Sequence, residues 1–408
     1  MIIKADLRHV IYALSDALDL VGVDDVGHGK RVGIMAYECG RRKGLTGAEL
    51  TFLFDLGILH DIGVSSTQIH RHIVAEFAWA GTGPHCEIGA ALLQEFKPLA
   101  SLAQPVRHHH TPWVELSTLG LEPDIAWQAN LICLTDRVDA RLMVHAAHDA
   151  ALAHVEEIRA EISGHAGTMF APDLVDLFLE TSRSESFWLM QEPRSIQTFI
   201  QDMLSQGPQY LASMGDLRQL ARIFSRIVDA KSPFTAVHSV GVACLAQLLA
   251  RKLGLGASSC AKIEIAGLLH DVGKLRVPDD ILDKPGRLDA QERLVINTHS
   301  FETYQILRNI KGFEEITPWA AYHHEEPGGS GYPFRLDANT LPIEARLVRV
   351  ADIFQAMVQD RPYRKGLNRE QTLAFLDDLV LQGRLEAEFV DLAASCGEEA
   401  MVAARGGC

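Results

Sequence analysis

The sequence predicts an all-α fold of two tandem helical domains joined by a linker. Apolar residues recur at helical spacing through much of the chain, as at Leu217, Leu220 and Phe224. Long apolar segments such as 344–358 lack the alternation of a half-buried strand. A motif that joins His to Asp also occurs twice, so a duplicated helical domain accounts for much of the 408-residue length.

The domain boundaries follow from helix-breaking residues between the two copies of the motif. Pro and Gly gather in residues 191–215, which we expect to be a linker with a short helix. We therefore expect a first domain at 1–190 and a second at 216–408. Apolar residues make up 47% of the chain, which is enough for substantial hydrophobic cores.

The charge balance disfavours several classes of protein. The chain has 38 Lys and Arg against 53 Asp and Glu, a net charge of −15, which argues against polymeric DNA or RNA and anionic membranes as partners. No apolar run approaches the ~20 residues of a membrane helix, and the N-terminus does not resemble a signal peptide. The seven Cys form no CxxC pair, which predicts reduced thiols and a cytoplasmic protein without membrane insertion.

The repeated motif belongs to two longer series of residues in the same order. In each half, 32 residues separate an earlier His from the motif His, and 24 residues separate two later His residues. The first series is His28, His60, Asp61, His85, His109, His110 and Asp136, and the second is His238, His270, Asp271, His299, His323, His324 and Asp352. Agreement over this many ordered positions indicates an internal duplication.

The residue types in these series are those of a metal site for phosphoester hydrolysis. Imidazoles and carboxylates suit Fe, Mn or Zn. An Asp directly after a His can bridge two ions, and seven ligand-type side chains suffice for two. Two ions can hold a hydroxide between them and neutralise the charge of a phosphate. A single His on an apolar helix is usually a core residue, but the complete second series argues against that interpretation.

Residues 232–365 resemble an HD-GYP domain, a branch of the HD superfamily of metal-dependent phosphohydrolases. The matching motifs occur in order, from FTAVHS and LLHDVGKLRVPDDILDKPG through NTHS and HHEEPGGSGYP to RVADIFQAM and RPYRK. The resemblance implies an all-helical fold and a metal centre of two or three ions. It also implies hydrolysis of cyclic dinucleotides, chiefly cyclic di-GMP.

The resemblance implies a metal-binding role for the whole second series. It assigns four residues to one ion and three to another, with Asp271 bridging: His238, His270, Asp271 and Asp352, then His299, His323 and His324. Phe234 stands where some members carry a Glu that holds a third ion, so we expect two ions. Fe or Mn is the favoured metal, and Zn, Ni or Mg are the alternatives.

The resemblance also supplies the expected catalytic and substrate-binding residues. Asp271 and Lys274 are the catalytic pair, and Lys274 would contact the scissile phosphate and help to protonate the leaving group. Tyr332, Arg361 and Arg364 would contact the substrate, and the guanidinium fork suits a phosphate or a guanine edge. Each has a simpler interpretation, as a local salt bridge for Lys274, turn chemistry for Tyr332 and surface charge for the arginines.

The expected reaction is hydrolysis of cyclic di-GMP by a metal-bridging hydroxide that attacks phosphorus in line with the 3′ oxygen. The product would be linear pGpG, with GMP after a second cut. One alternative is a phosphodiesterase for cyclic GMP-AMP. Another is a scaffold that responds to a cyclic dinucleotide without turnover and signals through contacts. A homodimer or a signalling-protein partner is compatible with each.

The first half keeps the seven ligand types and lacks the groups that would handle substrate. Val64 stands at the position of Lys274, no GSGYP follows His110, and no RPYRK follows Asp136. His108 leaves the register of the His pair open by one residue. Three interpretations remain: a different phosphohydrolase site, a metal-bearing regulatory or dimerising domain, and a vestigial site kept for packing. The pattern favours a site that binds metal without a cyclic dinucleotide.

Overall fold

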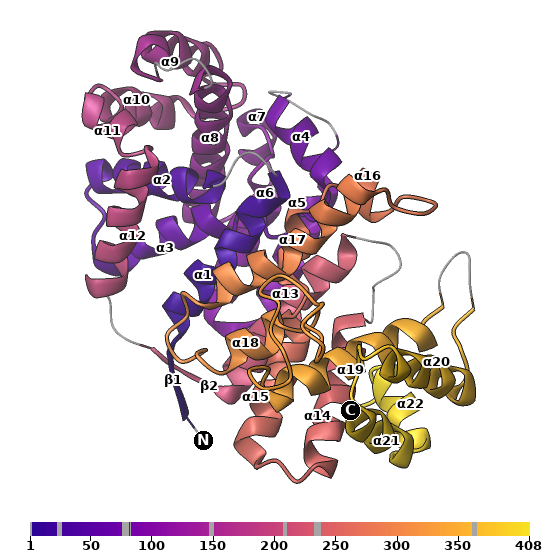
Figure 1. The fold of residues 1–408 in the computed structure, drawn as a ribbon. Helices are drawn as coiled ribbons and strands as arrows, with labels where there is room; N and C mark the ends of the chain where they lie inside the picture. The colour runs from indigo at the N-terminus through magenta and orange to yellow at the C-terminus, as the bar shows by residue number, and fades with distance from the viewer. Residues whose placement is uncertain are drawn as a thin grey trace. The chain divides into compact units, whose positions relative to one another are not determined.

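The chain is built almost wholly from helices, as the sequence predicted (Figure 1). The computed structural model describes residues 2–22, 27–75, 81, 83–146, 151–206, 210–231, 238–360 and 365–408. In these ranges the only sheet is an antiparallel pair of short strands, β1 (Ile2–Asp6) and β2 (Leu211–Ser213). Ile2 pairs with Ser213 and Asp6 with Leu211, with an irregular register between them.

The chain divides into two compact units that are not simply its first and second parts. The N-terminal unit is Asp24–Pro208, and the C-terminal unit combines Met1–Val23 with Gln209–Cys408. The first residues belong to the C-terminal unit because β1 pairs with β2, and because α1 (Leu7–Asp19) packs against helices of that unit. The expected limits of 1–190, 191–215 and 216–408 therefore differ from the structure, since pairing between distant strands leaves no local signal.

The regular elements of the N-terminal unit are all helices over its described residues. Its first two helices pack against each other, and the 24-residue helix α8 lies against both of them. In chain order the elements are α2 (His28–Lys43), α3 (Gly47–Leu59), α4 (Thr67–Ala75), α5 (Gly83–Glu95), η2 (Lys97–Leu102), α6 (Ala103–His108), α7 (Trp113–Leu116), α8 (Pro123–Ala146), η3 (Ala151–His154), α9 (Val155–Gly164), α10 (Pro172–Thr181), α11 (Glu185–Leu189) and α12 (Pro193–Gln206). The last of these is the helix expected in the linker.

The C-terminal unit surrounds a second pair of long helices, α14 and α15, which pack against each other and against α19. Besides β1, α1 and β2, it includes the short segment η1 (Leu20–Gly22). The other elements are α13 (Met214–Ala230), α14 (His238–Lys252), α15 (Ala257–Leu269), η4 (Val272–Arg276), α16 (Asp279–Leu282), α17 (Ala290–Leu307), α18 (Ile316–Ala321), α19 (Ile343–Val358), α20 (Arg369–Leu381), α21 (Ala387–Ser395) and α22 (Glu398–Ala404).

Helix α13 shows how the local sequence specifies these elements. Ser213 caps its start, because its hydroxyl accepts a hydrogen bond from the Asp216 amide while the Asp216 carboxylate accepts one from the Ser213 amide. The apolar residues predicted to share one face are buried, including Leu217, Leu220 and Phe224. Burial of such side chains is worth roughly 1.5–3 kcal/mol each, so this face fixes the helix against α14 and α15.

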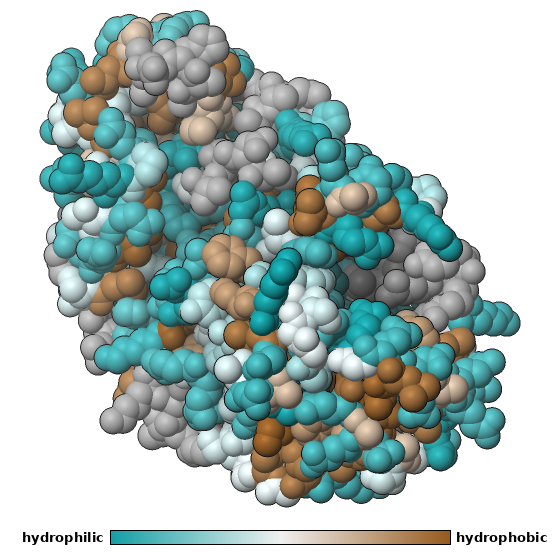
Figure 2. All heavy atoms as spheres, in the orientation of Figure 1, coloured by the Kyte–Doolittle hydropathy of each residue, from teal (hydrophilic) through white to brown (hydrophobic). Residues whose placement is uncertain are grey.

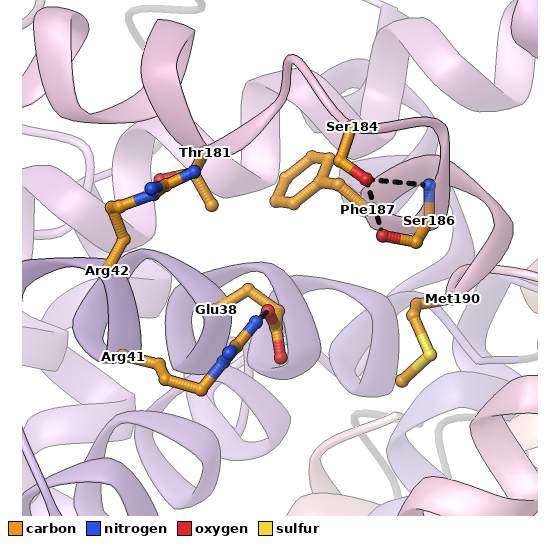
Figure 3. Close-up of a pocket in the computed structure, with 8 residues that line it drawn as sticks. All are labelled: Glu38, Arg41, Arg42, Thr181, Ser184, Ser186, Phe187 and Met190. Carbon is orange, nitrogen blue, oxygen red and sulfur yellow. Dashed lines mark hydrogen bonds and ion pairs between the residues drawn. The ribbon is translucent and has the colours of Figure 1, made fainter.

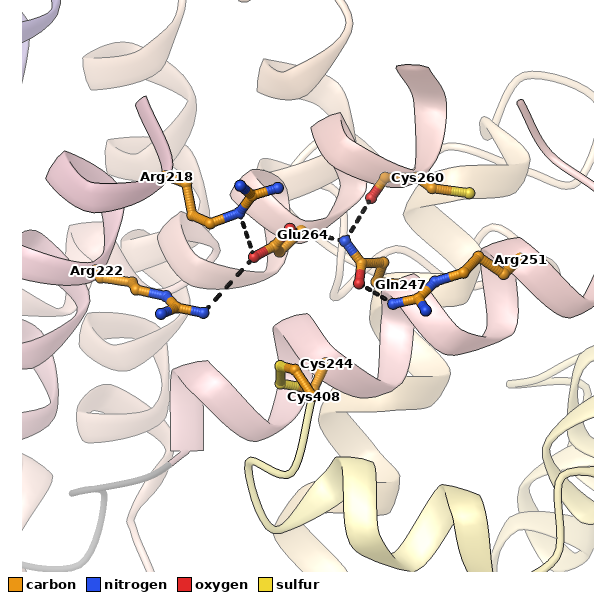
Figure 4. The surroundings of a disulfide bond; sticks show 8 residues. All are labelled: Arg218, Arg222, Cys244, Gln247, Arg251, Cys260, Glu264 and Cys408. Carbon is orange, nitrogen blue, oxygen red and sulfur yellow. Dashed lines mark hydrogen bonds and ion pairs between the residues drawn. A yellow bond between two sulfur atoms is a disulfide. The ribbon is translucent and has the colours of Figure 1, made fainter. Parts of the chain in front are cut away.

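The expectation that every cysteine is a free thiol is wrong at one pair. Cys244 on α14 and Cys408 form a disulfide, and the chain after α22 returns to α14 to make it (Figure 4). The two residues are 164 positions apart, so no local spacing could signal the pair. The other cysteines are free and buried: Cys39, Cys86, Cys133, Cys260 and Cys396.

The surface carries mainly hydrophilic side chains on the face shown in Figure 2, with smaller hydrophobic groups between them. Among the described residues, no helix combines the length and the apolar character needed to cross a membrane.

Candidate metal centres

The seven predicted ligands of the C-terminal unit come together in the structure. His238 begins α14, His299 lies in α17, and Asp352 lies in α19. The other four follow the ends of α15 and α18. Their ligand atoms form three overlapping groups, each within 4.8 Å: His238, His270 and Asp352; His270, Asp271 and His323; and His299, His323 and His324.

Asp271 lies between two sets of imidazoles. Its Oδ2 atom is 3.3 Å from His238 Nε2 and 3.2 Å from His270 Nε2. Its Oδ1 atom is 3.5 Å from His299 Nε2 and 3.8 Å from His323 Nε2. Each carboxylate oxygen thus faces a different pair of imidazoles, which is the arrangement that a carboxylate bridging two ions requires.

Outer partners orient the imidazoles so that Nε2 points into the centre. His270, His299 and His323 each donate from Nδ1 to a backbone carbonyl three residues earlier, at 2.6–2.8 Å. The Nδ1 of His238 donates instead to Oε1 of Gln355, a buried residue of α19, at 2.6 Å. Hydrogen bonds of this kind fix the tautomer and ring orientation of metal-binding histidines.

The charges of the centre fit a bound cation. Burial lowers the pKa of His238, but Asp271 and Asp352 outweigh it and raise that pKa to about 10. Burial raises the pKa of Asp352, yet its contact with His238 holds it well below its usual range. Asp271 Oδ1 is buried and has no hydrogen-bond partner among the described residues. Buried carboxylates and imidazole nitrogens facing one another suit a divalent ion.

Lys274 forms a salt bridge with Asp271, as expected if its role is local charge pairing. Its Nζ donates to Asp271 Oδ2 at 2.5 Å. Burial lowers the pKa of Lys274, but the charges of Asp271 and Asp352 raise it above its ordinary value. The side chain is therefore an ammonium at neutral pH, which can act as a proton donor or an electrostatic partner but not as a base.

The glycine of the HDVG motif permits a close approach between η4 and α17. A Cβ on Gly273 would lie 2.1 Å from the carbonyl oxygen of His299, which no side chain allows. Gly63 of the HDIG motif has the same relation to His85, at 2.0 Å. The motif therefore requires Gly for close packing of the backbone, while its His and Asp supply candidate ligand atoms to the centre.

The GYP loop lies against the centre. The ring of Tyr332 stacks on His324, with centroids 4.8 Å apart. Glu325 anchors the loop, because its carboxylate accepts hydrogen bonds from the amides of Phe334 at 2.6 Å and Leu336 at 2.8 Å. Gly331 is also required, since a Cβ there would lie 2.5 Å from the Cα of Glu325.

Two positioning residues, Glu325 and Gln355, are not among the predicted site residues. Glu325 follows directly on the His pair in HHEE, so a signal for it was present in the sequence. Gln355 has none, because a single amide on a helix is usually a surface residue. Arg361, Arg364 and Phe234, which the sequence singled out, lie outside the described residues.

The seven ligand-type residues of the N-terminal unit also meet. Ligand atoms of six of them form two groups within 4.8 Å, one of Asp61, His85, His109 and His110, and one of His28, His60 and Asp61. The seventh, Asp136, lies beside them, with its Oδ1 atom 3.3 Å from His28 Nε2. Asp61 belongs to both groups, so it lies between two sets of imidazoles as Asp271 does in the C-terminal unit. Of the three consecutive histidines, His109 and His110 lie in the group and His108 does not, which favours the register with His109 and His110 as the ligand pair.

A separate pocket in the N-terminal unit has a volume of about 580 Å³ (Figure 3). Arg41 and Arg42 extend from α2 on one side, and Phe187 faces them from α11. Arg41 is paired with Glu38, and no candidate metal ligand lines this pocket. It is thus distinct from both groups of metal-type residues.

Comparisons with known proteins identify the family. The model of the HD domain matches residues 222–388. The chain is 34% identical over 394 residues to 3′3′-cGAMP-specific phosphodiesterase 1 of Vibrio cholerae, covering 95% of this chain and 91% of that protein. It is 32% identical over 238 residues to the cyclic di-GMP phosphodiesterase response regulator RpfG of Xanthomonas campestris, covering 54% and 61% of the two chains.

A solved structure extends the likeness to the fold. The crystal structure of a cyclic GMP-AMP specific phosphodiesterase of V. cholerae, V-cGAP3, matches with a TM-score of 0.66 at 25% identity. The match covers 96% of this chain and 97% of that one. The chain belongs to the HD-domain family, in the HD-GYP branch that its motifs and relatives define.

Proposed function

We propose that the C-terminal unit is a metal-dependent phosphodiesterase that opens a cyclic dinucleotide at one phosphodiester bond. The observation that carries this proposal is the geometry of Asp271, whose two oxygens face two separate sets of imidazoles. Two neighbouring groups support the proposal. Lys274 contacts the same carboxylate and can serve as a proton donor, and Tyr332 stacks on His324 beside the centre.

We propose 3′3′-cGAMP as the substrate in preference to cyclic di-GMP. The relative matched over 91% of its length is named for specificity toward 3′3′-cGAMP, whereas RpfG, one of the relatives named for cyclic di-GMP, is matched over 61%. Cyclic di-GMP stays the second candidate because several relatives carry that name. In either case the expected product is the linear dinucleotide with a 5′ phosphate.

The ligand set would hold two divalent ions, with Asp271 shared between them. We propose Fe or Mn, because nitrogen and carboxylate oxygen donors without thiolate suit these metals. When bound, the ions would lower the pKa of water and neutralise charge on the phosphate. His238, His270 and Asp352 would bind one ion, and His299, His323 and His324 the other.

The remaining residues would bind and protonate the substrate. Lys274 carries a proton at neutral pH beside Asp271, so it can contact the scissile phosphate and donate that proton to the departing 3′ oxygen. Tyr332 would hold the ring of His324 and form one wall of the substrate site. Arg361 and Arg364 remain proposed contacts to the second phosphate or a base edge.

The experiment that tests this function compares substrates on one preparation. The full chain, reconstituted with Mn²⁺, is incubated with 3′3′-cGAMP or with cyclic di-GMP, and the linear product is quantified by chromatography. We expect the higher kcat/KM with 3′3′-cGAMP. Faster cleavage of cyclic di-GMP would overturn the substrate assignment. Binding of both nucleotides without cleavage of either would support the scaffold alternative and overturn the enzymatic proposal.

A further inference from the structure

The N-terminal unit contains a second group of metal-type side chains that the proposed phosphodiesterase does not use. We propose that this unit binds its own pair of divalent ions and retains them as a stabilising centre, without hydrolysing a cyclic dinucleotide. The proposal rests on the bridging position of one carboxylate, buried polar atoms around it that lack a hydrogen-bond partner, and a carboxylate that orients one imidazole.

Asp61 has the bridging position. Its Oδ2 atom lies 3.5 Å from His60 Nε2 and 3.9 Å from His28 Nε2. Its Oδ1 atom lies 3.5 Å from His85 Nε2 and 3.6 Å from His109 Nε2. The two oxygens therefore face different pairs of imidazoles, as they do at Asp271 in the other unit.

Several polar atoms at this centre are buried without a hydrogen-bond partner among the described residues. They are both carboxylate oxygens of Asp61, Oδ1 of Asp136, and the Nε2 atoms of His109 and His110. Buried polar atoms without partners destabilise a fold, and buried charges without partners do so more strongly. Divalent ions between these atoms would satisfy all of them.

The lysine that contacts Asp271 has no counterpart beside Asp61. In the C-terminal unit the ammonium of Lys274 contacts Asp271. At the corresponding position Val64 is apolar and buried. Arg137 donates to Oδ2 of Asp136 at 2.6 Å, so it compensates that carboxylate directly, and its charge also acts on Asp61. Without the lysine the centre also lacks the proton donor proposed for the departing oxygen.

The outer partner of His28 favours retention of an ion. Its Nδ1 donates to Oδ2 of Asp139 at 2.7 Å, and Arg31 donates to the same carboxylate at 2.6 and 2.9 Å. The equivalent partner of His238 is the neutral amide of Gln355. A carboxylate partner raises the basicity of a metal-binding imidazole and strengthens its bond to the ion.

Counting ions in matched variants tests the proposal. The full chain and its Asp61→Asn and Asp271→Asn variants are loaded with Mn²⁺, freed of weakly bound metal by gel filtration, and assayed for Mn by elemental analysis. We expect about four ions per chain in the parent and about two in each variant, because each centre holds a pair. Spin-coupled Mn pairs should remain visible by electron paramagnetic resonance in Asp271→Asn. A parent with about two ions, unchanged by Asp61→Asn, overturns the proposal.

A second variant keeps the test decisive if Asp61→Asn does not fold. In the Asp271→Asn background, Asp139→Asn should weaken Mn²⁺ retention about 10- to 100-fold, because it removes the carboxylate behind His28. The same background should show a Mn²⁺-dependent rise in Tm. Absence of both Mn²⁺ retention and a Tm shift in a folded Asp271→Asn chain would overturn the proposal, and protonated imidazoles would then balance the two carboxylates without a metal.

Discussion

Gln355 offers a sharp test of how the C-terminal centre is positioned, because it binds His238 at Nδ1, the ring nitrogen that faces away from the other ligands. Its buried Oε1 accepts the Nδ1 hydrogen of His238 at 2.6 Å. Gln355→Leu leaves that buried N–H without a partner, which costs about 1–3 kcal/mol. At 1.4 kcal/mol for each factor of ten, this corresponds to a loss of roughly 5- to 150-fold in metal affinity.

The assay is competition for Mn²⁺ between the protein and a chelating dye, with kcat/KM for 3′3′-cGAMP measured on the same samples. The matched control is Gln355→Glu, which restores an acceptor and imitates the carboxylate that Asp139 presents to His28 in the N-terminal unit. We expect Gln355→Glu to bind Mn²⁺ at least as tightly as the parent. If Gln355→Leu folds normally and its Mn²⁺ affinity stays within about twofold, the reasoning about His238 is refuted.

Three further changes probe other parts of the site. Lys274→Met should lower kcat about 10²- to 10⁴-fold by removing the proton donor, and Lys274→Arg should retain part of the kcat that Lys274→Met loses. Steady-state kinetics of Lys274→Met that show no loss of kcat would exclude the donor role. Glu325→Ala should raise KM and lower the Tm, because the amides of Phe334 and Leu336 lose their hydrogen-bond acceptor, which costs about 1–3 kcal/mol for each amide. An unchanged KM would show that the loop does not contribute to substrate binding. Removal of metal with a chelator should abolish turnover and lower the Tm. Mn²⁺ at about 100 times its Kd should then restore about 2.7 kcal/mol of stability. Activity that survives chelation would contradict metal dependence.

The sequence was sufficient to predict the all-α fold and the groups of ligand-type residues, because both depend on repeated local patterns. Helical spacing predicted the buried face of α13, and spacing from the HDVG motif selected residues that meet in space. The ligand roles themselves stay predictions. The two halves could be compared position by position because the spacings agree.

The features that the sequence did not reveal depend on contacts between distant parts of the chain. β1 pairs with β2 across some 200 residues, which moves the N-terminal segment into the C-terminal unit. Cys408 reaches Cys244 from the end of the chain. Gln355 acquires its role only because α19 packs against the start of α14. None of these pairs has a local spacing or motif that distinguishes it from ordinary surface or core residues.

Turnover of 3′3′-cGAMP by the Mn²⁺-loaded parent, Asp271→Asn and Asp61→Asn shows which unit carries the reaction. We expect a loss of at least about 100-fold in Asp271→Asn, because the shared carboxylate is needed to hold both ions at the reacting phosphate. We expect turnover of the same order as the parent in Asp61→Asn. Loss of turnover in Asp61→Asn together with normal turnover in Asp271→Asn would contradict the proposed function and place the reaction in the N-terminal unit.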